Sequence, residues 1–312
     1  MKKLLFFTIV LSLVFTSCKS KKQIVPADFI LRKDGCIEIK KIEHFVLENK
    51  WGEPTKKISN RAKRPYLLIY LDSLGNVIEK IGYGKYHNTD LRLLDFVEQN
   101  IFENGRLTST IKYKTDYCKN INADFKTIYS YNSANQLIQE KVLYFETDSL
   151  FMQFDYEYDT NGNNTKTIII AKSSFNPTYY KRTFDSQSRL QSLQQIYDSN
   201  LRWEWTYTYT DTTRIGDFRT YYNNGKDYTK QEIRTYQNGK LTGIEERYTS
   251  RDGLSEKTIF HYDQHGLINK IDFFHMFGND YVLRKYREVK VEYCIELTPI
   301  LIEEINEIIY DE

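Results

Sequence analysis

The sequence is short of the residues from which metal and redox centres are built. Among its 312 residues are four cysteines, five histidines and three methionines, and no Cys-x-x-Cys pair occurs. The glycine-rich loops of nucleotide-binding proteins, the serine-hydrolase elbow and the His-Glu-x-x-His motif of zinc proteases are all missing. We therefore predict that the protein is not an enzyme and carries no metal or other cofactor.

An excess of charge of one sign is also lacking. Lys and Arg number 44 against 42 for Asp and Glu, which leaves a net charge of +2. This balance offers no basic surplus for binding nucleic acid. The mean hydropathy of −0.59 excludes a chain with several membrane-spanning helices. With 40% hydrophobic and 28% charged residues, the composition is that of a folded, soluble body.

Aromatic residues are plentiful where proline is scarce. The chain has 26 Tyr but only 5 Pro, and 15% of its residues are aromatic. Aromatic side chains favour the pleated, half-buried surface of a sheet. The composition therefore favours a mainly β protein.

The first residues have the layout of a secretory signal. Lys2 and Lys3 precede a short apolar run that ends in Thr16-Ser17-Cys18. This end resembles the lipobox of Bacteroidetes lipoproteins, which implies cleavage after residue 17 and acylation of Cys18. We predict a signal peptide at 1–17 and a lipid-anchored linker at 18–30, on an outer-membrane lipoprotein of the cell envelope. An ordinary signal peptide with an incidental cysteine is the alternative. The lysines that follow Cys18 favour the periplasmic face over the surface.

Three cysteines remain in the mature chain, at Cys36, Cys118 and Cys294. Export permits disulfides, but an odd number leaves at least one thiol outside any intramolecular bridge. Three pairings are possible, and the sequence does not choose among them.

The most informative feature is an internal repeat. Similar turns rich in Asp, Asn and Gly recur at residues 71–77, 102–107, 131–137, 158–163, 184–190, 236–241 and 262–267. With a degenerate copy at 209, successive starts from 131 to 262 lie 25 to 27 residues apart. Each unit has a second turn about halfway along, so it holds two strands of about nine residues. Between the turns apolar and polar residues alternate, as in an antiparallel meander.

The repeat body is predicted to span residues 61–297 with about 16–18 strands. Open twisted sheets of more than ~10 strands curl or split. We therefore expect the meander to close into a barrel or to curve as a spiral or half-pipe. Which of its faces is concave stays open.

The turn pattern, seen most fully at Tyr158–Gly162 and Tyr262–Gly266, resembles the YD repeats of the RHS family. The chain is also similar to Bacteroidetes lipoproteins with β-repeats, which include domains of unknown function with a porin-like curved sheet. This resemblance implies architecture more than activity.

Short helices are predicted near both ends of the body. Ile39, Ile42, Phe45 and Val46 are spaced as on one side of a helix, which predicts a helical cap at 31–60. Thr298-Pro299 suits a helix start, and an apolar stripe then predicts a helix at 298–312. A last strand is the alternative for that segment.

Two groups of side chains are candidates for a site. Trp203, Trp205, Tyr207 and Tyr209 alternate with polar residues and form either a cross-strand core ladder or a platform on which a ligand stacks. His261, Asp263 and His265 could bind a metal in a hydrolase, but they span a regular repeat turn, and we reject this alternative. We predict a non-catalytic envelope protein that binds an extended partner, a glycan or a peptide. A purely structural role in envelope assembly is the second hypothesis.

Overall fold

The structure is a computed structural model that describes residues 35–49, 54–58, 66–85, 92–115, 121–174, 176–221, 228–248, 255–277 and 280–311. These residues form 19 strands and a C-terminal helix. The strands are β1 (Ile37–Glu48), β2 (Pro54–Ile58), β3 (Leu67–Leu71), β4 (Val77–Lys85), β5 (Arg92–Glu103), β6 (Arg106–Thr115), β7 (Ile121–Tyr131), β8 (Leu137–Tyr144), β9 (Leu150–Tyr158), β10 (Asn164–Ala171), β11 (Thr178–Phe184), β12 (Leu190–Tyr197), β13 (Asn200–Tyr209), β14 (Thr213–Thr220), β15 (Thr229–Gln237), β16 (Lys240–Tyr248), β17 (Ser255–Tyr262), β18 (Ile268–Phe277) and β19 (Asp280–Tyr293). The helix is α2 (Pro299–Asp311).

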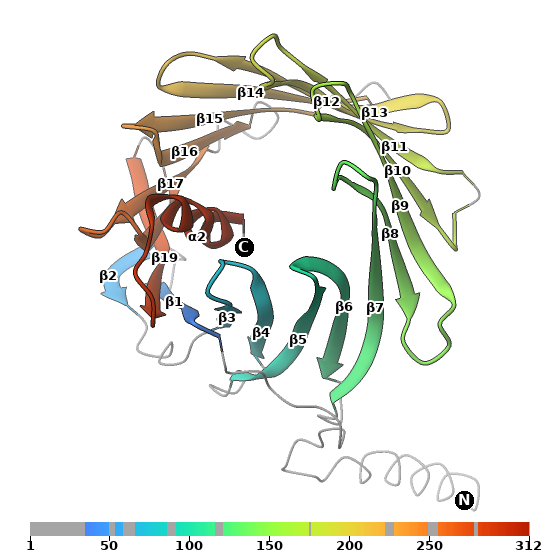
Figure 1. Ribbon diagram of the computed structural model, residues 1–312. Helices are drawn as coiled ribbons and strands as arrows, with labels where there is room; N and C mark the ends of the chain where they lie inside the picture. The colour runs from blue at the N-terminus through green and yellow to red at the C-terminus, as the bar shows by residue number, and fades with distance from the viewer. Residues whose placement is uncertain are drawn as a thin grey trace, which may run out of the picture.

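The sheet closes on itself. From β3 to β19 each strand pairs antiparallel with its neighbour in the chain, and β1 pairs with β19 on one side and with β3 on the other. Eighteen strands, β1 and β3–β19, therefore form a closed barrel (Figure 1), while β2 pairs only with the far end of β1. The predicted antiparallel meander is confirmed, and of the three shapes left open the barrel is the one adopted.

The repeat turns share one hydrogen-bonding pattern. In the turn that begins at Asp159, the carboxylate Oδ1 accepts from the backbone N–H groups of Asn161 and Asn163 at 2.9 and 2.8 Å. The same two bonds form in the turns that begin at Asp72, Asn132, Asp185 and Asp263. The fourth position takes a positive φ, +85° at Gly162, which glycine adopts without strain. These local bonds are why Asp or Asn recurs at the start of each turn.

The tyrosines of the repeat connect each turn to the one before it. The Tyr158 hydroxyl donates to the carbonyl of Leu137 at 2.7 Å, and the Tyr262 hydroxyl donates to that of Leu241 at 2.7 Å. Tyr131 and Tyr209 make the same bond to Leu107 and Leu190. The acceptor is each time the leucine that ends the preceding repeat turn. The period of about 26 residues is thus the distance along the chain between neighbouring hairpins on the barrel wall.

The helical cap predicted at 31–60 is wrong. Residues 37–48 form strand β1, which closes the barrel between β19 and β3, and Pro54 begins strand β2. Ile37 and Ile39 are fully buried at alternate positions, as a strand with one covered face requires. The spacing from Ile39 to Val46 fits a helix equally well, but only the strand provides the hydrogen-bond partners that β3 and β19 need.

The predicted C-terminal helix is confirmed, and it lies inside the ring of strands (Figure 1). Its first turn is capped by Thr298, whose Oγ1 accepts from the Leu301 N–H at 3.2 Å. Leu301, Ile305 and Ile309 are 7%, 0% and 0% exposed. They pack with apolar residues of the inner barrel face, namely Ile37, Ile39, Leu67, Ile69, Leu71, Phe260, Leu267, Ile268, Ile271 and Val289.

Polar contacts fix the helix in place at its middle and at its C-terminal end. The Asn306 side chain accepts from the Ile268 N–H and donates to the Gly266 carbonyl, each at 2.8 Å, so α2 is bound to a repeat turn. The fully buried Lys41 donates through Nζ to the Ile309 carbonyl at 2.9 Å. A cation at this place satisfies the free carbonyls at the C-terminus of a helix.

The seam between the first and last strands of the barrel carries a disulfide. Cys36 and Cys294 are bonded, with their Cα atoms 5.4 Å apart and 258 residues between them in sequence. The Cys294 N–H also donates to the Cys36 carbonyl at 3.0 Å. Of the three pairings left open, this is the one formed, and Cys118 lies outside the described residues.

Candidate functional site

The position of α2 tells which face of the sheet lines the lumen. Arg234 lies with its guanidinium 5.0 Å from the ring centroid of Tyr310 on α2, so its side chain is inside the barrel. Arg234 is paired across the strands with Arg214, and Arg214 with Tyr209. Directly opposite residues share a face of the sheet, and so do alternate residues of one strand. The row from Trp203 to Tyr209 therefore faces the lumen, and the concave face is the aromatic one.

Rings from four strands and one strand end meet in a continuous patch. The ring centroids of Trp205 and Phe218 are 5.0 Å apart, and those of Trp203 and Phe218 are 5.8 Å apart. The patch continues to Tyr180 on one side and through Tyr228 to Tyr248 on the other. We call this set the aromatic wall: Tyr180, Trp203, Trp205, Tyr207, Phe218, Tyr228 and Tyr248.

A glycine on the neighbouring strand lets two rings of the wall lie flat. Trp205 and Tyr207 are stacked with an interplanar angle of 7° and centroids 5.9 Å apart. A Cβ at Gly216, opposite Tyr207 on β14, would lie 2.9 Å from Tyr207 Cε1 and 3.1 Å from Trp205 Cε3. The bare backbone at Gly216 thus leaves the room that the two rings occupy.

The aromatic wall is accessible from the lumen. All its rings are partly exposed, whereas the inner-face residues packed against α2, such as Ile39 and Ile69, are 0% exposed. A closed ring of 18 strands encloses more space than its inward side chains fill. The helix α2 covers one side of that space. The aromatic wall lies on β11–β16, and several of these strands are not covered by the helix (Figure 1).

An ion-pair cluster borders the wall on the side of α2. Glu232 accepts from Arg234 Nε at 2.6 Å and from Arg214 at 3.2 Å. Burial alone would raise the pKa of the Glu232 carboxyl, but the two guanidinium groups outweigh it and hold that pKa below its ordinary value. Arg214 also lies 5.2 Å from the ring centroid of Tyr207. Glu232 is therefore ionised at neutral pH, and its Oε1 accepts from both arginines.

A second ion pair lies next to the first, because Glu246 on β16 is directly across from Glu232 on β15. Lys230 Nζ donates to Glu246, and the other carboxylate oxygen of Glu246 accepts from the Tyr248 hydroxyl at 2.7 Å. Burial, together with this bond to a carboxylate, raises the pKa of Tyr248. Lys230 also lies 5.6 Å from the ring centroid of Trp205. Cations thus lie over the rings of Trp205 and Tyr207 in the wall.

Arg182 on β11 differs from these arginines in its partners. Its Nη1 donates to Asn164 Oδ1 at 2.5 Å and to Thr167 Oγ1 at 2.9 Å. Within the described ranges no carboxylate lies at ion-pair distance from it. Burial lowers the pKa of its guanidinium, which nevertheless stays cationic at neutral pH. Across the sheet it is level with Leu193 and Trp205.

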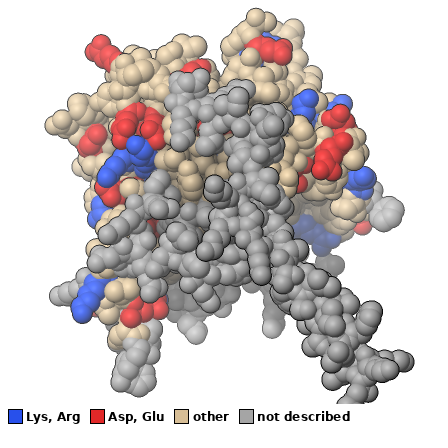
Figure 2. All heavy atoms as spheres, turned by 90° about the horizontal axis from the view of Figure 1, so that it is seen from below, with Lys and Arg blue, Asp and Glu red and all other residues tan. Residues whose placement is uncertain are grey.

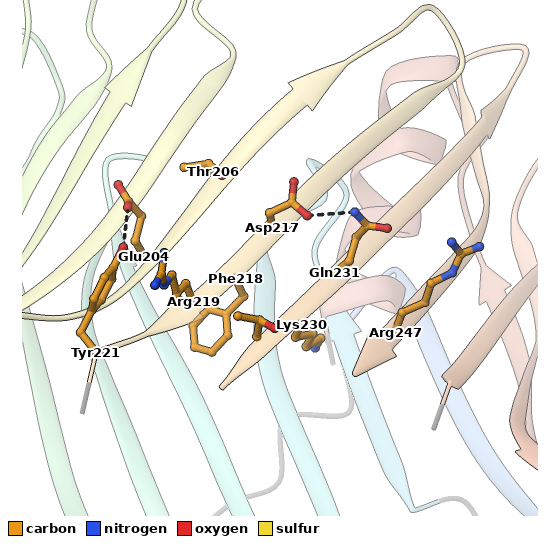
Figure 3. A pocket seen from close by; sticks show the side chains of 10 residues that line it. Glu204, Thr206, Asp217, Phe218, Arg219, Tyr221, Lys230, Gln231 and Arg247 are labelled. Atoms are coloured by element: carbon orange, nitrogen blue, oxygen red, sulfur yellow. Dashed lines mark hydrogen bonds between the residues drawn. The ribbon is translucent and has the colours of Figure 1, made fainter. Parts of the chain in front are cut away.

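The outward face of the same strands is polar and largely paired with itself. A depression of about 510 Å³ there is lined by residues of β13–β16. Figure 3 shows Gln231 donating to Asp217 at 2.9 Å and Tyr221 donating to Glu204 at 3.3 Å. On the face seen from below, basic and acidic side chains are interspersed without a large area of one sign (Figure 2). The side chains that line this depression on β13–β16 are thus mainly polar, unlike the lipid-facing band of a membrane barrel.

The rejected metal site has no support in the geometry. His261 Nε2 lies 2.8 Å from Asp272 Oδ2, whereas the carboxylate of Asp263 accepts from the amides of its own turn. His265 contacts Gln264 instead. In the part of the chain that the structure describes, no three His, Cys, Asp or Glu side chains are grouped to bind a metal.

The sequence found part of the wall. Trp203, Trp205 and Tyr207 belong to it, but Tyr209 uses its hydroxyl for the repeat bond to Leu190. The sequence analysis did not identify the residues that come from other strands, namely Tyr180, Phe218, Tyr228, Tyr248 and the arginines. The hairpin turns are the signal that could have identified them. The turn between β13 and β14 sets the register that places Phe218 opposite Trp205. The other predicted site residue, Cys18, lies outside the described residues.

No protein-family model matches the sequence, and no curated protein matches it. A porin-like protein from Bacteroides uniformis is similar in structure, with a TM-score of 0.42 and 9% identity over 82% of this chain and 95% of that one. The Tc holotoxin pore of Photorhabdus luminescens gives a TM-score of 0.30 at 12% identity, over 79% of this chain and 16% of that one. Membership of the YD-repeat family stays a prediction. None of the helices in the described ranges has the length and apolarity to cross a membrane.

Proposed function

We propose that the barrel is a non-catalytic binding protein of the cell envelope, which holds an extended glycan in its lumen against the aromatic wall. The observation that carries this proposal is the wall itself, a continuous patch of partly exposed rings on the inner face. The rings of Trp205 and Tyr207 are stacked on each other and present a flat apolar surface. The C–H face of a sugar ring matches such a surface, and binding sites typically combine aromatic walls with a few polar groups.

A glycan fits this site better than a peptide. Extended peptides usually bind by adding a strand to a free sheet edge. The ring of eighteen strands has no free edge, because β1 is paired on both sides. Stacking on ring faces and hydrogen bonds to side chains remain available, and a glycan uses both.

Mutation of Trp205 tests the proposal. Trp205→Leu keeps an apolar side chain on the inner face and removes the aromatic surface. We expect the purified variant to melt close to the wild type and to lose at least tenfold in affinity on a glycan array, as is typical of central aromatic residues in binding sites. The matched control is Thr206→Ala, the adjacent exposed residue on the outward face, which should bind as the wild type does. Absence of array binding by the wild type would overturn the proposal and leave a structural role in envelope assembly.

We also propose that the barrel is tethered to the outer membrane by lipid on Cys18, at its periplasmic face. The leader that ends in Thr16-Ser17-Cys18 supports export and acylation. The Cys36–Cys294 disulfide is consistent with an oxidising compartment outside the cytosol. The polar exterior of β13–β16 supports a tethered barrel rather than one inserted in lipid.

Cell fractionation tests the tether. With Cys18→Ala we expect the protein to leave the membrane fraction and to lose label from a radioactive fatty acid, because the acyl chains supply the anchoring free energy. Cys118→Ala serves as the control and should remain in membranes and labelled. Continued acylation of Cys18→Ala would show that another residue is the anchor.

A further inference from the structure

The border of the aromatic wall carries more positive than negative charge. Its inward-facing charged residues are four cations and three anions: Arg182, Arg214, Lys230, Arg234, Glu232, Glu246 and Glu256. On the face of the molecule seen from below, in contrast, described side chains of both signs are interspersed (Figure 2). The surplus is therefore a property of this part of the lumen, and the chain as a whole has a net charge of only +2.

The three anions at this border already have partners, and that of Glu256 is His275 at 3.5 Å. Glu232 is shared between Arg214 and Arg234, and Glu246 is bonded to Lys230 and Tyr248. The Arg214–Glu232–Arg234 cluster has two guanidinium groups and one carboxylate, which leaves one positive charge in excess. Moreover, Arg214 Nε is buried and has no hydrogen-bond partner within the described residues.

Arg182 is a second cation for which the described residues provide no carboxylate at ion-pair distance. Its two hydrogen bonds go to an amide oxygen and a hydroxyl, and both start from Nη1. A guanidinium has five N–H donors in a planar fork, which suits the two oxygens of one acidic group. Arg182 lies level with Trp205, separated from it by Leu193 on the strand between. Arg182 and Trp205 are therefore about two strand spacings apart, or about 10 Å. A ligand stacked on Trp205 has the Arg182 cation to one side at about this distance.

We infer that the glycan of the proposed function is acidic, and that one of its carboxylate or sulfate groups binds Arg182 while a neighbouring sugar stacks on the aromatic wall. This inference rests on the proposed function and adds the ligand's charge to it. The separation of about 10 Å corresponds to about two sugar units of an extended chain, so the ligand is an oligosaccharide or polysaccharide rather than a single sugar. The surplus cation at Arg214 provides a second site of attraction on the other side of Trp205.

Binding to a glycan array with neutral, carboxylated and sulfated members tests this inference. We expect the wild type to bind acidic members, with an affinity that falls steeply as salt is raised. Arg182→Gln keeps a side chain that can contact Asn164 and Thr167, and we expect it to lower affinity for the acidic members about tenfold or more. The matched control is Lys181→Gln, which removes the same charge from the neighbouring exposed residue on the outward face and should change little.

The outcomes separate the two proposals. Binding to carboxylated members alone or to sulfated members alone identifies the acidic group and supports the inference. If the wild type binds neutral and acidic members equally, or if both variants weaken binding alike, Arg182 has no specific role and the inference is overturned while glycan binding stands. If the wild type binds no member of the array, glycan binding and the inference fail together.

Discussion

Ile305→Asp is expected to prevent the barrel from folding. Ile305 lies at the centre of α2 with none of its surface exposed, among the apolar residues of the inner face. A carboxylate at this position would be surrounded by apolar side chains, while the nearby Lys41 is already bound to the Ile309 carbonyl, and a poorly compensated buried charge costs several kcal/mol at least. Loss of the isoleucine side chain adds about 2–5 kcal/mol. Together these costs match the whole stability of an ordinary domain, about 5–15 kcal/mol.

Circular dichroism and thermal melting of the purified protein would show this effect. Ile300→Asp is the matched control, because Ile300 lies in the first turn of the same helix and is 71% exposed. We expect the control to melt within a few degrees of the wild type. A cooperative, near-normal transition for Ile305→Asp would mean that α2 is dispensable for the barrel, and its burial in the lumen would then need another explanation.

Breaking the Cys36–Cys294 disulfide is expected to lower the melting temperature by about 10–20 °C. The bond links strands at the two ends of the chain, 258 residues apart, and so restricts the unfolded chain over nearly all of its length. The chain-entropy relation gives about 5 kcal/mol for a loop of this size, at the upper end of the measured range. For a chain of this length a change of 1 kcal/mol shifts the melting temperature by about 2–4 °C. The bond also holds closed the seam at which β1 meets β19.

Melting with and without reductant, for the wild type and for Cys36→Ser/Cys294→Ser, provides the measurement. The reduced wild type and the double variant should melt at the same lower temperature, and reductant should have no further effect on the variant. A reductant effect that persists in the double variant would assign the stabilisation to another cysteine. No shift in either sample would show that the hydrogen bonds of the seam are sufficient.

The central part of the fold was predictable because its information is local. Asp159 binds amides two and four residues ahead, and Gly162 takes a conformation that its own lack of a side chain permits. Such turns place strands at regular intervals, and alternation such as Trp203, Trp205 and Tyr207 then gives each strand an apolar face. The C-terminal helix was predictable for the same reason, since its cap at Thr298 and its stripe at Leu301, Ile305 and Ile309 lie within one short segment.

By itself, then, the sequence determined the turns, the antiparallel meander, the C-terminal helix and the aromatic row on β13, all of which depend on neighbours in the chain. Only the tertiary structure decided that residues 37–48 form a strand and that the ring closes there, because β1 takes its hydrogen bonds from β3 and β19. It also decided which face is concave. Two faces of a strand differ only in what covers them, and α2, which packs on the aromatic face, comes from the far end of the chain.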